Sequence, residues 1–456
     1  MLTRLRVKGF KSLEDVEIRF GPLTCIVGPN NAGKSNLFDA ITFLSRLAEV
    51  PIMEAVRSVR SSGVASLFTQ TAHQRAQVIG LEADLLIDSR VTDDFGRECH
   101  ASATYLRYTL ELRYSPGGPN CKEEISLKRE TLSALPKADL PRTLGFSVSK
   151  EFLASVYHGS RKRDFISMDD GAAEAVLHRD SSSGQPVRFP LTPRRTVLSS
   201  VNTVDFPTVL AVKREMQSWV TLGLELSALR RPDEFYAPAH VSSQGRHLPA
   251  TLERLESREA ISTKLAELVP DVDEVFVRAD TERETKTLSL KLRSGVVHDA
   301  KTLSDGLLRF LALAILEADV ESGRLLCVEE PENGLHPKGM ASVLALLKQI
   351  PVDPTYALGP DNPLRQVIVN THAPALVQSL RLDELLICHT YRGDGALLSA
   401  YSPLQNTWRD NANEHALGLG AVFAYLNGDL ESPYDLPGAL NIKQMYEQEL
   451  ALFQPK

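Results

Sequence analysis

An eight-residue loop near the start of the chain is the feature that most limits what it can fold into. Residues 28–35 read G-P-N-N-A-G-K-S, a complete G-x-x-x-x-G-K-[ST] pattern, and they directly follow the apolar run Leu23–Val27. Glycines let the backbone turn so that successive N–H groups face inward as an anion-binding nest, and a helix starting there points its positive end at the same place. The loop therefore predicts a strand–loop–helix unit that binds a nucleoside triphosphate, although the same letters could form an ordinary glycine turn.

Each part of this loop has an expected task. Lys34 would reach the β and γ phosphates and Ser35 would hold Mg²⁺, because a lysine and a hydroxyl serve that chemistry at these two positions. Leu37, Ile41 and Leu44 then recur at helical spacing, which predicts a helix with one buried face. The residues expected to line the phosphates are Gly28, Pro29, Asn30, Asn31, Ala32, Gly33, Lys34, Ser35 and Asn36.

The bulk properties set wider limits. A chain of 456 residues with 43 % hydrophobic content can bury a large core and suggests two or three structural units. A net charge of −7 gives no overall attraction for nucleic acid, so such contact must come from local patches. The five cysteines are scattered without a C-x-x-C pair, and no run approaches the roughly 18 to 20 apolar residues of a membrane span. We expect a cytoplasmic protein with no membrane segment.

Hydrophobic periodicity predicts an α/β fold with an antiparallel β subdomain and a helical insertion. From 303 onward the order is helix, strand (Leu325–Val328), helix (338–350) and strand (Gln366–Val369), which predicts a parallel sheet with crossover helices. Residues 136–205 are rich in Ser, Arg, Pro and Gly and are expected to be loops. The expected segments are 1–80 (first lobe with the phosphate loop), 81–135 (antiparallel β subdomain), 136–234 (insertion of loops and helices), 235–401 (second lobe) and 402–456 (helical tail).

Shorter elements are expected inside these segments. Helical periodicity covers Pro207–Leu229 and Leu248–Leu268, and alternation predicts strands at Glu274–Val277 and Leu288–Leu292. Alternating runs at Val78–Ala83, Tyr105–Tyr114 and Ile125–Leu132 predict the strands of the antiparallel subdomain.

A second chemical site is predicted where the strand Leu325–Val328 ends in adjacent carboxylates, Glu329 and Glu330. Buried parallel strands deliver their final side chains to one edge of the sheet, where the phosphate loop also opens. Glu329 would help to position Mg²⁺, and Glu330 would orient and deprotonate the attacking water. An exposed acidic turn is the alternative, but it does not explain the apolar strand before the carboxylates.

Two further segments downstream of the phosphate loop contain candidate phosphate contacts. His372 follows the strand Gln366–Val369, where an imidazole can bond a γ-phosphate oxygen, although a lone histidine is more often structural. Ser304, Asp305 and Gly306 precede an apolar helical pattern. Taken alone they form an N-cap, and such a helix start also offers N–H groups to a phosphate.

The combined order of motifs resembles the ABC-type ATPase heads of the SMC, RecF and OLD group over residues 1–80 and 235–425. The segments G-P-N-N-A-G-K-S-N, L-S-D-G-L-L-R-F-L-A-L-A, E-E-P-E-N-G-L-H-P and N-T-H-A-P-A-L-V are most similar to the AAA15/AAA21 family of bacterial OLD-like ATPases. The resemblance implies an ABC-type P-loop fold, with ATP and Mg²⁺ as ligands and ATP hydrolysis as the activity. It also implies that Ser304, Asp305 and Gly306 form a signature motif that closes on the nucleotide of an opposite copy.

Some residues of this chain differ from the motifs of the wider ABC group. The signature reads Ser-Asp-Gly where transporters have Ser-Gly-Gly-Gln, and Glu329 stands where most have Asp, which argues against a transporter subunit. The Q-loop glutamine is not placed, and Gln70, Gln74 and Gln77 are all candidates. The chain has no long coiled coil, and no acidic cluster typical of a TOPRIM nuclease domain follows His372. We therefore expect no DNA cleavage by this polypeptide.

The resemblance also implies partners. Two heads would enclose two ATP molecules in a homodimer or a higher homo-oligomer, and that closure would regulate a separately encoded effector, often a nuclease, in anti-phage defence. The alternative is a RecF-like repair or recombination ATPase that binds DNA directly. Its contacts would be the basic clusters Arg161–Arg163, Arg194–Arg195 and Arg230–Arg231, each of which could equally be solvated surface.

Overall fold

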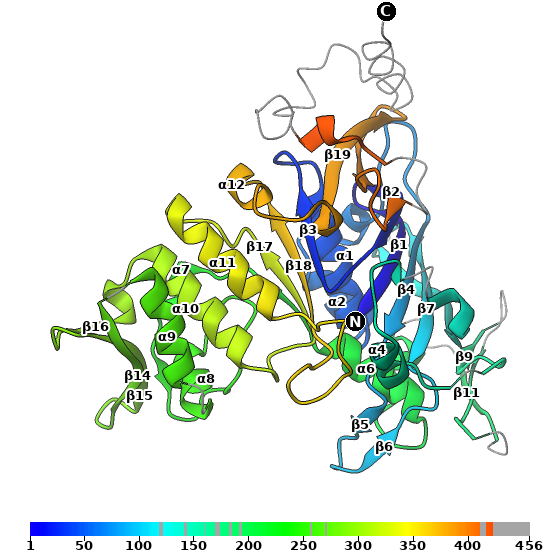
Figure 1. Ribbon diagram of the computed structural model, residues 1–456. Helices are drawn as coiled ribbons and strands as arrows, with labels where there is room; N and C mark the ends of the chain where they lie inside the picture. Colours follow the sequence, from blue (N-terminus) through cyan, green and yellow to red (C-terminus); the bar gives the residue numbers. More distant parts are fainter. Residues whose placement is uncertain are drawn as a thin grey trace, which may run out of the picture.

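A six-stranded sheet at the centre of the molecule is built from distant parts of the chain (Figure 1). The computed structural model describes residues 1–117, 122–140, 144–159, 161–168, 174–181, 185–190, 194–255, 258–269, 271–410 and 416–422. The strand order is β12 (Trp219–Leu222), β17 (Leu325–Glu329), β18 (Gln366–Thr371), β3 (Leu23–Val27), β19 (Leu385–Gly393) and β20 (Ala396–Ser402). All neighbours are parallel except β19 and β20. The carboxyl ends of β3, β17 and β18 therefore meet at one edge of the sheet.

Helices cover one face of this sheet. Leu308 and Leu311 of α10 (Asp305–Ala318) share a buried cluster with Val328 of β17 and Val369 of β18, because an apolar helix face needs an apolar sheet face. A second layer packs outside α10 and forms the green lobe of Figure 1. The elements on this side are α7 (Leu226–Leu229), β13 (Asp233–Glu234), α8 (Leu248–Arg254), α9 (Arg258–Leu268), β14 (Val272–Asp280), β15 (Thr285–Leu292), β16 (Val297–Asp299), η3 (Ala300–Thr302), α10 (Asp305–Ala318), α11 (Pro337–Gln349), α12 (Pro374–Val377) and η4 (Leu382–Glu384).

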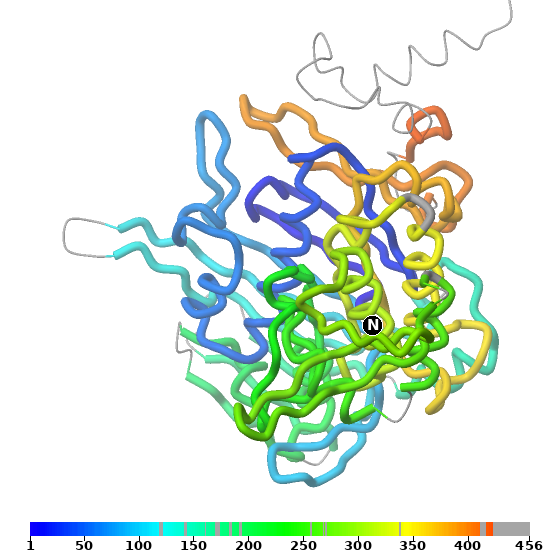
Figure 2. The backbone as a smooth tube through the Cα atoms, turned by 90° about the vertical axis from the view of Figure 1, so that its left-hand side faces the viewer, coloured from blue at the N-terminus to red at the C-terminus, as the bar shows by residue number. Residues whose placement is uncertain are grey.

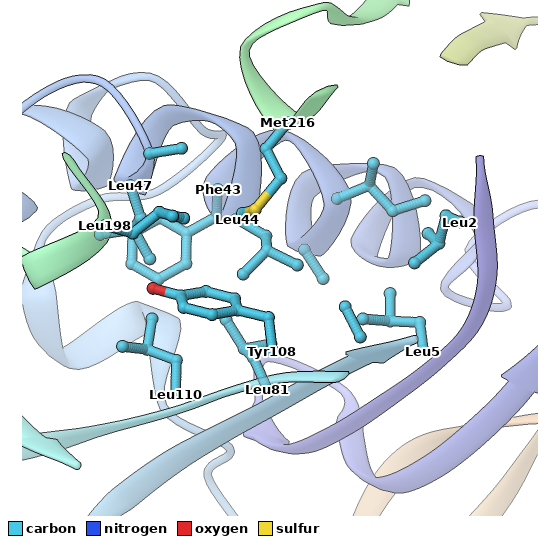
Figure 3. Packing of buried hydrophobic residues seen from close by; sticks show 14 of the residues in the cluster. Leu2, Leu5, Phe43, Leu44, Leu47, Leu81, Tyr108, Leu110, Leu198 and Met216 are labelled. Carbon is cyan, nitrogen blue, oxygen red and sulfur yellow. The ribbon is translucent and has the colours of Figure 1, made fainter. Parts of the chain in front are cut away.

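Helix α1 (Lys34–Leu47) covers the other face and is itself covered by an eight-stranded antiparallel sheet. Figure 3 shows this layer, in which Leu44 of α1 and Met216 of α6 (Pro207–Gln217) lie close to Tyr108 of the sheet. The sheet order is β11 (Val187–Pro190), β10 (Glu174–Leu177), β9 (Ile166–Ser167), β8 (Glu124–Ala134), β7 (Tyr105–Ser115), β4 (Val78–Leu86), β1 (Leu2–Phe10) and β2 (Leu13–Arg19).

Smaller elements surround these layers. The hairpin of β5 (Arg90–Thr92) and β6 (Glu98–His100) projects from the lower end of the molecule in both views (Figure 1 and Figure 2). The others are α2 (Ile52–Arg57), η1 (Val64–Leu67), η2 (Lys137–Asp139), α4 (Lys150–Val156) and α5 (Val197–Ser200). None of the helices among the described residues has the length and apolar character needed to cross a membrane.

The structure agrees with most of the expected elements and corrects others. The strands expected between 78 and 132, and the order of helices and strands from 303 to 369, are confirmed. The expectation of loops over 136–205 was wrong in part, because β9, β10 and β11 extend the antiparallel sheet there. The helical pattern expected over Pro207–Leu229 is broken by β12, whose buried Trp219 and Leu222 fit a strand as well as a helix. Most of the expected helical tail, 402–456, lies outside the described residues.

Candidate functional site

The phosphate-type loop lies between β3 and α1, as its sequence predicts. Asn31 and Gly33 have positive φ angles of 64° and 103°, and Gly33 is the N-cap of α1, so the loop curls just before the helix starts. The Lys34 ammonium donates to the backbone carbonyls of Gly28 at 2.7 Å and Pro29 at 2.8 Å. Burial lowers the pKa of Lys34. The lysine is thus held across the loop by two of the loop's own carbonyls.

Strands β19 and β20 support the outer side of this loop. The Tyr401 hydroxyl donates to the Gly33 carbonyl at 2.8 Å, and the Cys388 thiol donates to the Ala32 carbonyl at 3.3 Å. Burial raises the pKa of Cys388 to about 12, so the thiol keeps its proton and remains a donor. A Cβ atom on Gly28 would lie 2.1 Å from the Cys388 carbonyl oxygen, so glycine is required here by close approach.

Arg60 lies at the centre of an ionic cluster beside the loop. Its guanidinium donates to Glu329 Oε1 at 2.8 Å, to Asp39 Oδ1 at 3.0 Å and to the Ser35 carbonyl at 3.1 Å. Lys11 adds a second cation, 2.6 Å from Asp39 Oδ2. One guanidinium nitrogen, Nη2, therefore holds the backbone of Ser35 and the carboxylate of Glu329, the two expected Mg²⁺ ligands, close together.

Glu330 and His372 form a pair at the same edge of the sheet. The distance from His372 Nδ1 to Glu330 Oε1 is 3.2 Å, and the Asn333 amide donates to Glu330 Oε2 at 2.6 Å. Glu330 has a φ angle of 44°, a conformation that is costly for a residue with a side chain. Its backbone N–H donates to the Asn370 carbonyl at 2.8 Å, which fixes this turn against β18. The carboxylate is 36 % exposed, so water can reach it.

The expected signature residues begin helix α10. Ser304 is its N-cap residue and is exposed, yet its hydroxyl makes no capping hydrogen bond. The Arg230 guanidinium donates to Asp305 Oδ1 at 2.5 Å and to the Leu303 carbonyl at 3.1 Å, which holds the helix start from outside. A Cβ atom on Gly306 would lie 2.9 Å from the Gly334 carbonyl oxygen. The start of α10 is therefore packed directly on the turn that follows the two carboxylates.

Several contributors were missed at the sequence level. Arg60, Asp39 and Lys11 carry no motif, and only the fold brings them to the loop. Glu332 stands inside the E-E-P-E segment, but its spacing gave no reason to separate it from a surface carboxylate. It is 4 % exposed and bonded to the strand that ends at Thr371.

Other candidates have local partners instead. The Gln70 amide donates to the Thr71 and Gln74 carbonyls, and the Gln77 amide donates to the Arg75 carbonyl. These contacts lie within residues 70–77 and assign none of the three glutamines to the site.

The donor set fits a triphosphate with Mg²⁺. A curled loop of backbone N–H groups, a lysine, a serine hydroxyl and a carboxylate are the groups that such a ligand requires. The Oδ1 atom of Asn370 is buried and accepts no hydrogen bond, and Asn370 pairs in register with Glu329 on the neighbouring strand. A buried acceptor of this kind beside Glu329 suits a metal ion or its bound water.

Two family models match separate ranges of the chain. Residues 1–103 match the AAA_15 family, described as "AAA ATPase domain", and residues 176–378 match the AAA_21 family, described as "AAA domain, putative AbiEii toxin, Type IV TA system". The two matched ranges contain all the motifs described above.

Short stretches also match curated proteins. The OLD nuclease of Thermus scotoductus is 58 % identical over 41 residues, which are 9 % of this chain and 8 % of that protein. The DNA replication and repair protein RecF of Magnetococcus marinus is 49 % identical over 45 residues, 10 % of this chain and 12 % of RecF. The alignments thus cover only about a tenth of either relative.

Among solved structures, SMC head domains are similar to this chain. The SMC head bound to the C-winged helix domain of ScpA matches with a TM-score of 0.49 and 14 % identity, covering 89 % of this chain and 98 % of that one. The SMC head domain from Thermotoga maritima matches with a TM-score of 0.40 and 16 % identity, covering 89 % and 99 % of the two chains.

Proposed function

We propose that this chain is an ABC-type ATPase of the group that includes OLD, RecF and SMC proteins, and that it hydrolyses ATP to switch a partner effector. The observation that carries the proposal is the convergence of three strand ends. The loop after β3, the carboxylates at the end of β17 and the histidine after β18 lie at one edge of one sheet. Open α/β sheets bind their ligands at this edge.

The residues at this edge divide the work of hydrolysis. The loop N–H groups and Lys34 bind the phosphates, and Ser35 with Glu329 would hold Mg²⁺, which neutralises phosphate charge when bound. Glu330 accepts the proton of the attacking water. His372, 3.2 Å from Glu330, lies where it can orient that carboxylate or bond the γ-phosphate.

A second copy of the chain is expected to complete the site. Ser304 is exposed and its hydroxyl makes no capping hydrogen bond to the first N–H groups of α10, while Arg230 bonds the Asp305 carboxylate beside them. Such a helix start suits a phosphate. We propose that it contacts ATP held by the opposite copy, so that ATP binding favours a closed homodimer.

The effector role rests on the relatives. The AAA_21 description names a toxin of a type IV toxin–antitoxin system, and one curated relative is an OLD nuclease. A toxin or nuclease controlled by an ATPase is consistent with anti-phage defence. We propose that the effector here is a separately encoded protein and that the assembly acts in the cytoplasm.

ATP turnover and dimerisation test this function together. We expect the wild-type protein to hydrolyse ATP, Lys34→Ala to lose ATP binding, and Glu330→Gln to bind ATP but accumulate as a dimer in size-exclusion chromatography. Loss of the general base should reduce kcat by about 10²- to 10⁴-fold. Normal turnover by Glu330→Gln would remove Glu330 from its assigned role. A pull-down from the native host, with and without ATP, would then identify the effector.

A RecF-like DNA-binding ATPase is the second candidate, favoured by the short RecF matches. The basic clusters give it limited support. Arg230 is bonded to Asp305, Arg195 donates to the Glu49 carbonyl, and Arg161 donates to the Arg179 carbonyl. ATP-dependent DNA binding that weakens steeply with salt would favour this candidate over the effector switch.

A nuclease within the chain is tested by incubation with plasmid and Mg²⁺ or Mn²⁺, and we expect no cutting. Among the described residues, His240, Asp319 and Glu321 lie close enough to hold a cation. Arg254 already forms ion pairs with both carboxylates, at 2.7 Å with Asp319 and 3.0 Å with Glu321, which does not favour a metal ion there.

A further inference from the structure

Glu332 connects the turn after β17 to the end of β18. Its Oε1 atom accepts a hydrogen bond from the Thr371 hydroxyl at 2.6 Å and another from the backbone N–H of His372 at 3.2 Å. Oε1 also lies 3.7 Å from His372 Nδ1. Glu332 Oε1 therefore lies beside three groups: the Thr371 hydroxyl, the His372 backbone N–H and the His372 imidazole.

The burial of this carboxylate makes these bonds decisive for the local structure. Glu332 is 4 % exposed, and a buried carboxylate is costly unless hydrogen-bond donors satisfy it. Its second oxygen, Oε2, is buried without a hydrogen-bond partner. The hydrogen bonds that this carboxylate accepts thus come from Thr371 and His372. They hold the end of β18 and the Glu332 side chain in place relative to each other.

The Thr371 hydroxyl extends the same connection. It donates to Glu332 and accepts from the backbone N–H of Ala373 at 3.1 Å, so it also sets the direction in which the chain leaves the strand. On the other side, the Leu335 N–H donates to the Glu332 carbonyl at 3.0 Å. This holds residues 332–335 as a closed turn, and the same turn packs against Gly306 at the start of α10.

We propose that Glu332 is a positioning residue for His372. It acts through the backbone N–H of His372 and through Thr371, and it keeps the imidazole within reach of Glu330 during ATP hydrolysis. The inference rests on the proposed function, which gives His372 its part in turnover. Glu332 itself touches neither the reacting phosphate nor the water in this assignment.

Activity measurements separate positioning from simple stabilisation. We expect Glu332→Ala and Thr371→Val each to lower kcat by about tenfold with the ATP dissociation constant changed less than about twofold, because a displaced group costs rate before it costs binding. Glu332→Gln keeps an acceptor oxygen at the same place and should retain most of kcat. Glu317→Ala removes the 2.5 Å ion pair between Glu317 on α10 and Lys264 on α9, and it is the control for loss of a carboxylate elsewhere in this lobe.

A double-mutant cycle with His372 decides whether the effect passes through the imidazole. In a His372→Ala background, Glu332→Ala should lower kcat by less than about twofold further. An equal loss in both backgrounds would overturn the proposal, and so would a Glu332→Gln variant as slow as Glu332→Ala. Thr371→Val supplies the same comparison if Glu332→Ala does not fold.

Hydrogen exchange gives a readout that does not depend on ATPase activity. Glu332→Ala should accelerate amide exchange in peptides containing residue 372 by about tenfold or more, relative to Glu317→Ala, because the His372 N–H loses a charged acceptor. Unchanged exchange would overturn the positioning role. If wild-type protein shows no ATP turnover, the proposed function fails, while this exchange measurement still decides whether Glu332 holds the strand end.

Discussion

Replacement of Gly28 by alanine tests whether the phosphate loop depends on strand β19 for its shape. The new Cβ atom would lie 2.1 Å from the Cys388 carbonyl oxygen and 3.0 Å from the Cys388 carbonyl carbon, whereas ordinary contacts begin at 3.4 Å. Gly28 does not have a positive φ angle, so alanine meets no backbone strain there. The effect of Gly28→Ala is therefore a steric one, between the loop and a buried strand.

The size of the effect follows from this distance. The loop and β19 must separate by roughly 1 Å, and β19 is held on both sides by β3 and β20, so the loop is the part that moves. Overpacking of this kind costs about 1–3 kcal/mol of unfolding free energy. A misplacement of about 1 Å in the N–H nest should weaken ATP binding by about 10- to 100-fold.

Two assays measure these quantities separately. Urea unfolding gives the change in unfolding free energy, and isothermal titration calorimetry with ATP and Mg²⁺ gives the dissociation constant at a temperature where both proteins are folded. Gly359→Ala is the matched control, because a Cβ atom on Gly359 meets no heavy atom within 4 Å and its φ angle is not positive. We expect Gly359→Ala to leave both quantities at wild-type values.

An ATP dissociation constant within twofold of wild type for Gly28→Ala would refute this reasoning. It would mean that the loop reaches its binding shape without the contact to Cys388. A large loss of unfolding free energy with an unchanged ATP dissociation constant would also refute the prediction. It would mean that β19 moves and that the phosphate loop keeps its shape.

Three further predictions concern other parts of the site and the core. Arg60→Ala should lower the Mg²⁺ concentration needed for half-maximal ATP binding by several-fold, since the guanidinium now neutralises Glu329 at 2.8 Å; a Mg²⁺ titration with an unchanged midpoint would contradict this. Gly306→Ala should keep ATP affinity but lower kcat, because its Cβ would lie 2.9 Å from the Gly334 carbonyl oxygen, and steady-state kinetics would show it. Burial raises the pKa of Glu130 to about 7, against hydrogen bonds that lower it. Glu130 holds its proton more tightly in the folded state, so the unfolding free energy of the wild-type protein should fall by ~3 kcal/mol between about pH 5 and 7. Urea unfolding of Glu130→Gln over the same pH range should not show this fall.

Sequence patterns predicted the parts of the site that lie on strand ends. The loop at 28–35, the carboxylates at 329 and 330 and the histidine at 372 each follow an apolar run, and such runs are buried strands whose ends share an edge. The roles of these residues stay predictions, but their juxtaposition needed only the strand order. The clearest case is the pair of Glu330 and His372, whose side chains approach within 3.2 Å.

The rest of the site depends on contacts that no short pattern records. Arg60 reaches Glu329 across 269 positions, and Cys388 reaches Ala32 across 356. Such pairs form only when distant segments pack together. Their residue types are common on surfaces and in cores, so the sequence does not mark them as part of a site. Strand β12 was missed for a different reason, because a four-residue apolar run between two helices fits either period.

The position of β3 explains why two separate ranges of the chain carry the family matches. β3 comes from the first 30 residues, yet its neighbours β18 and β19 come from residues 366–393. Gly28 leaves β3 beside Cys388 of β19, and Thr371 ends β18 beside Val27 of β3. The loop can therefore take its shape only when the last third of the chain has packed around the first strand. The loop and the carboxylate turn therefore belong to one sheet, which is the arrangement that the proposed ATP-driven switch would need to couple them.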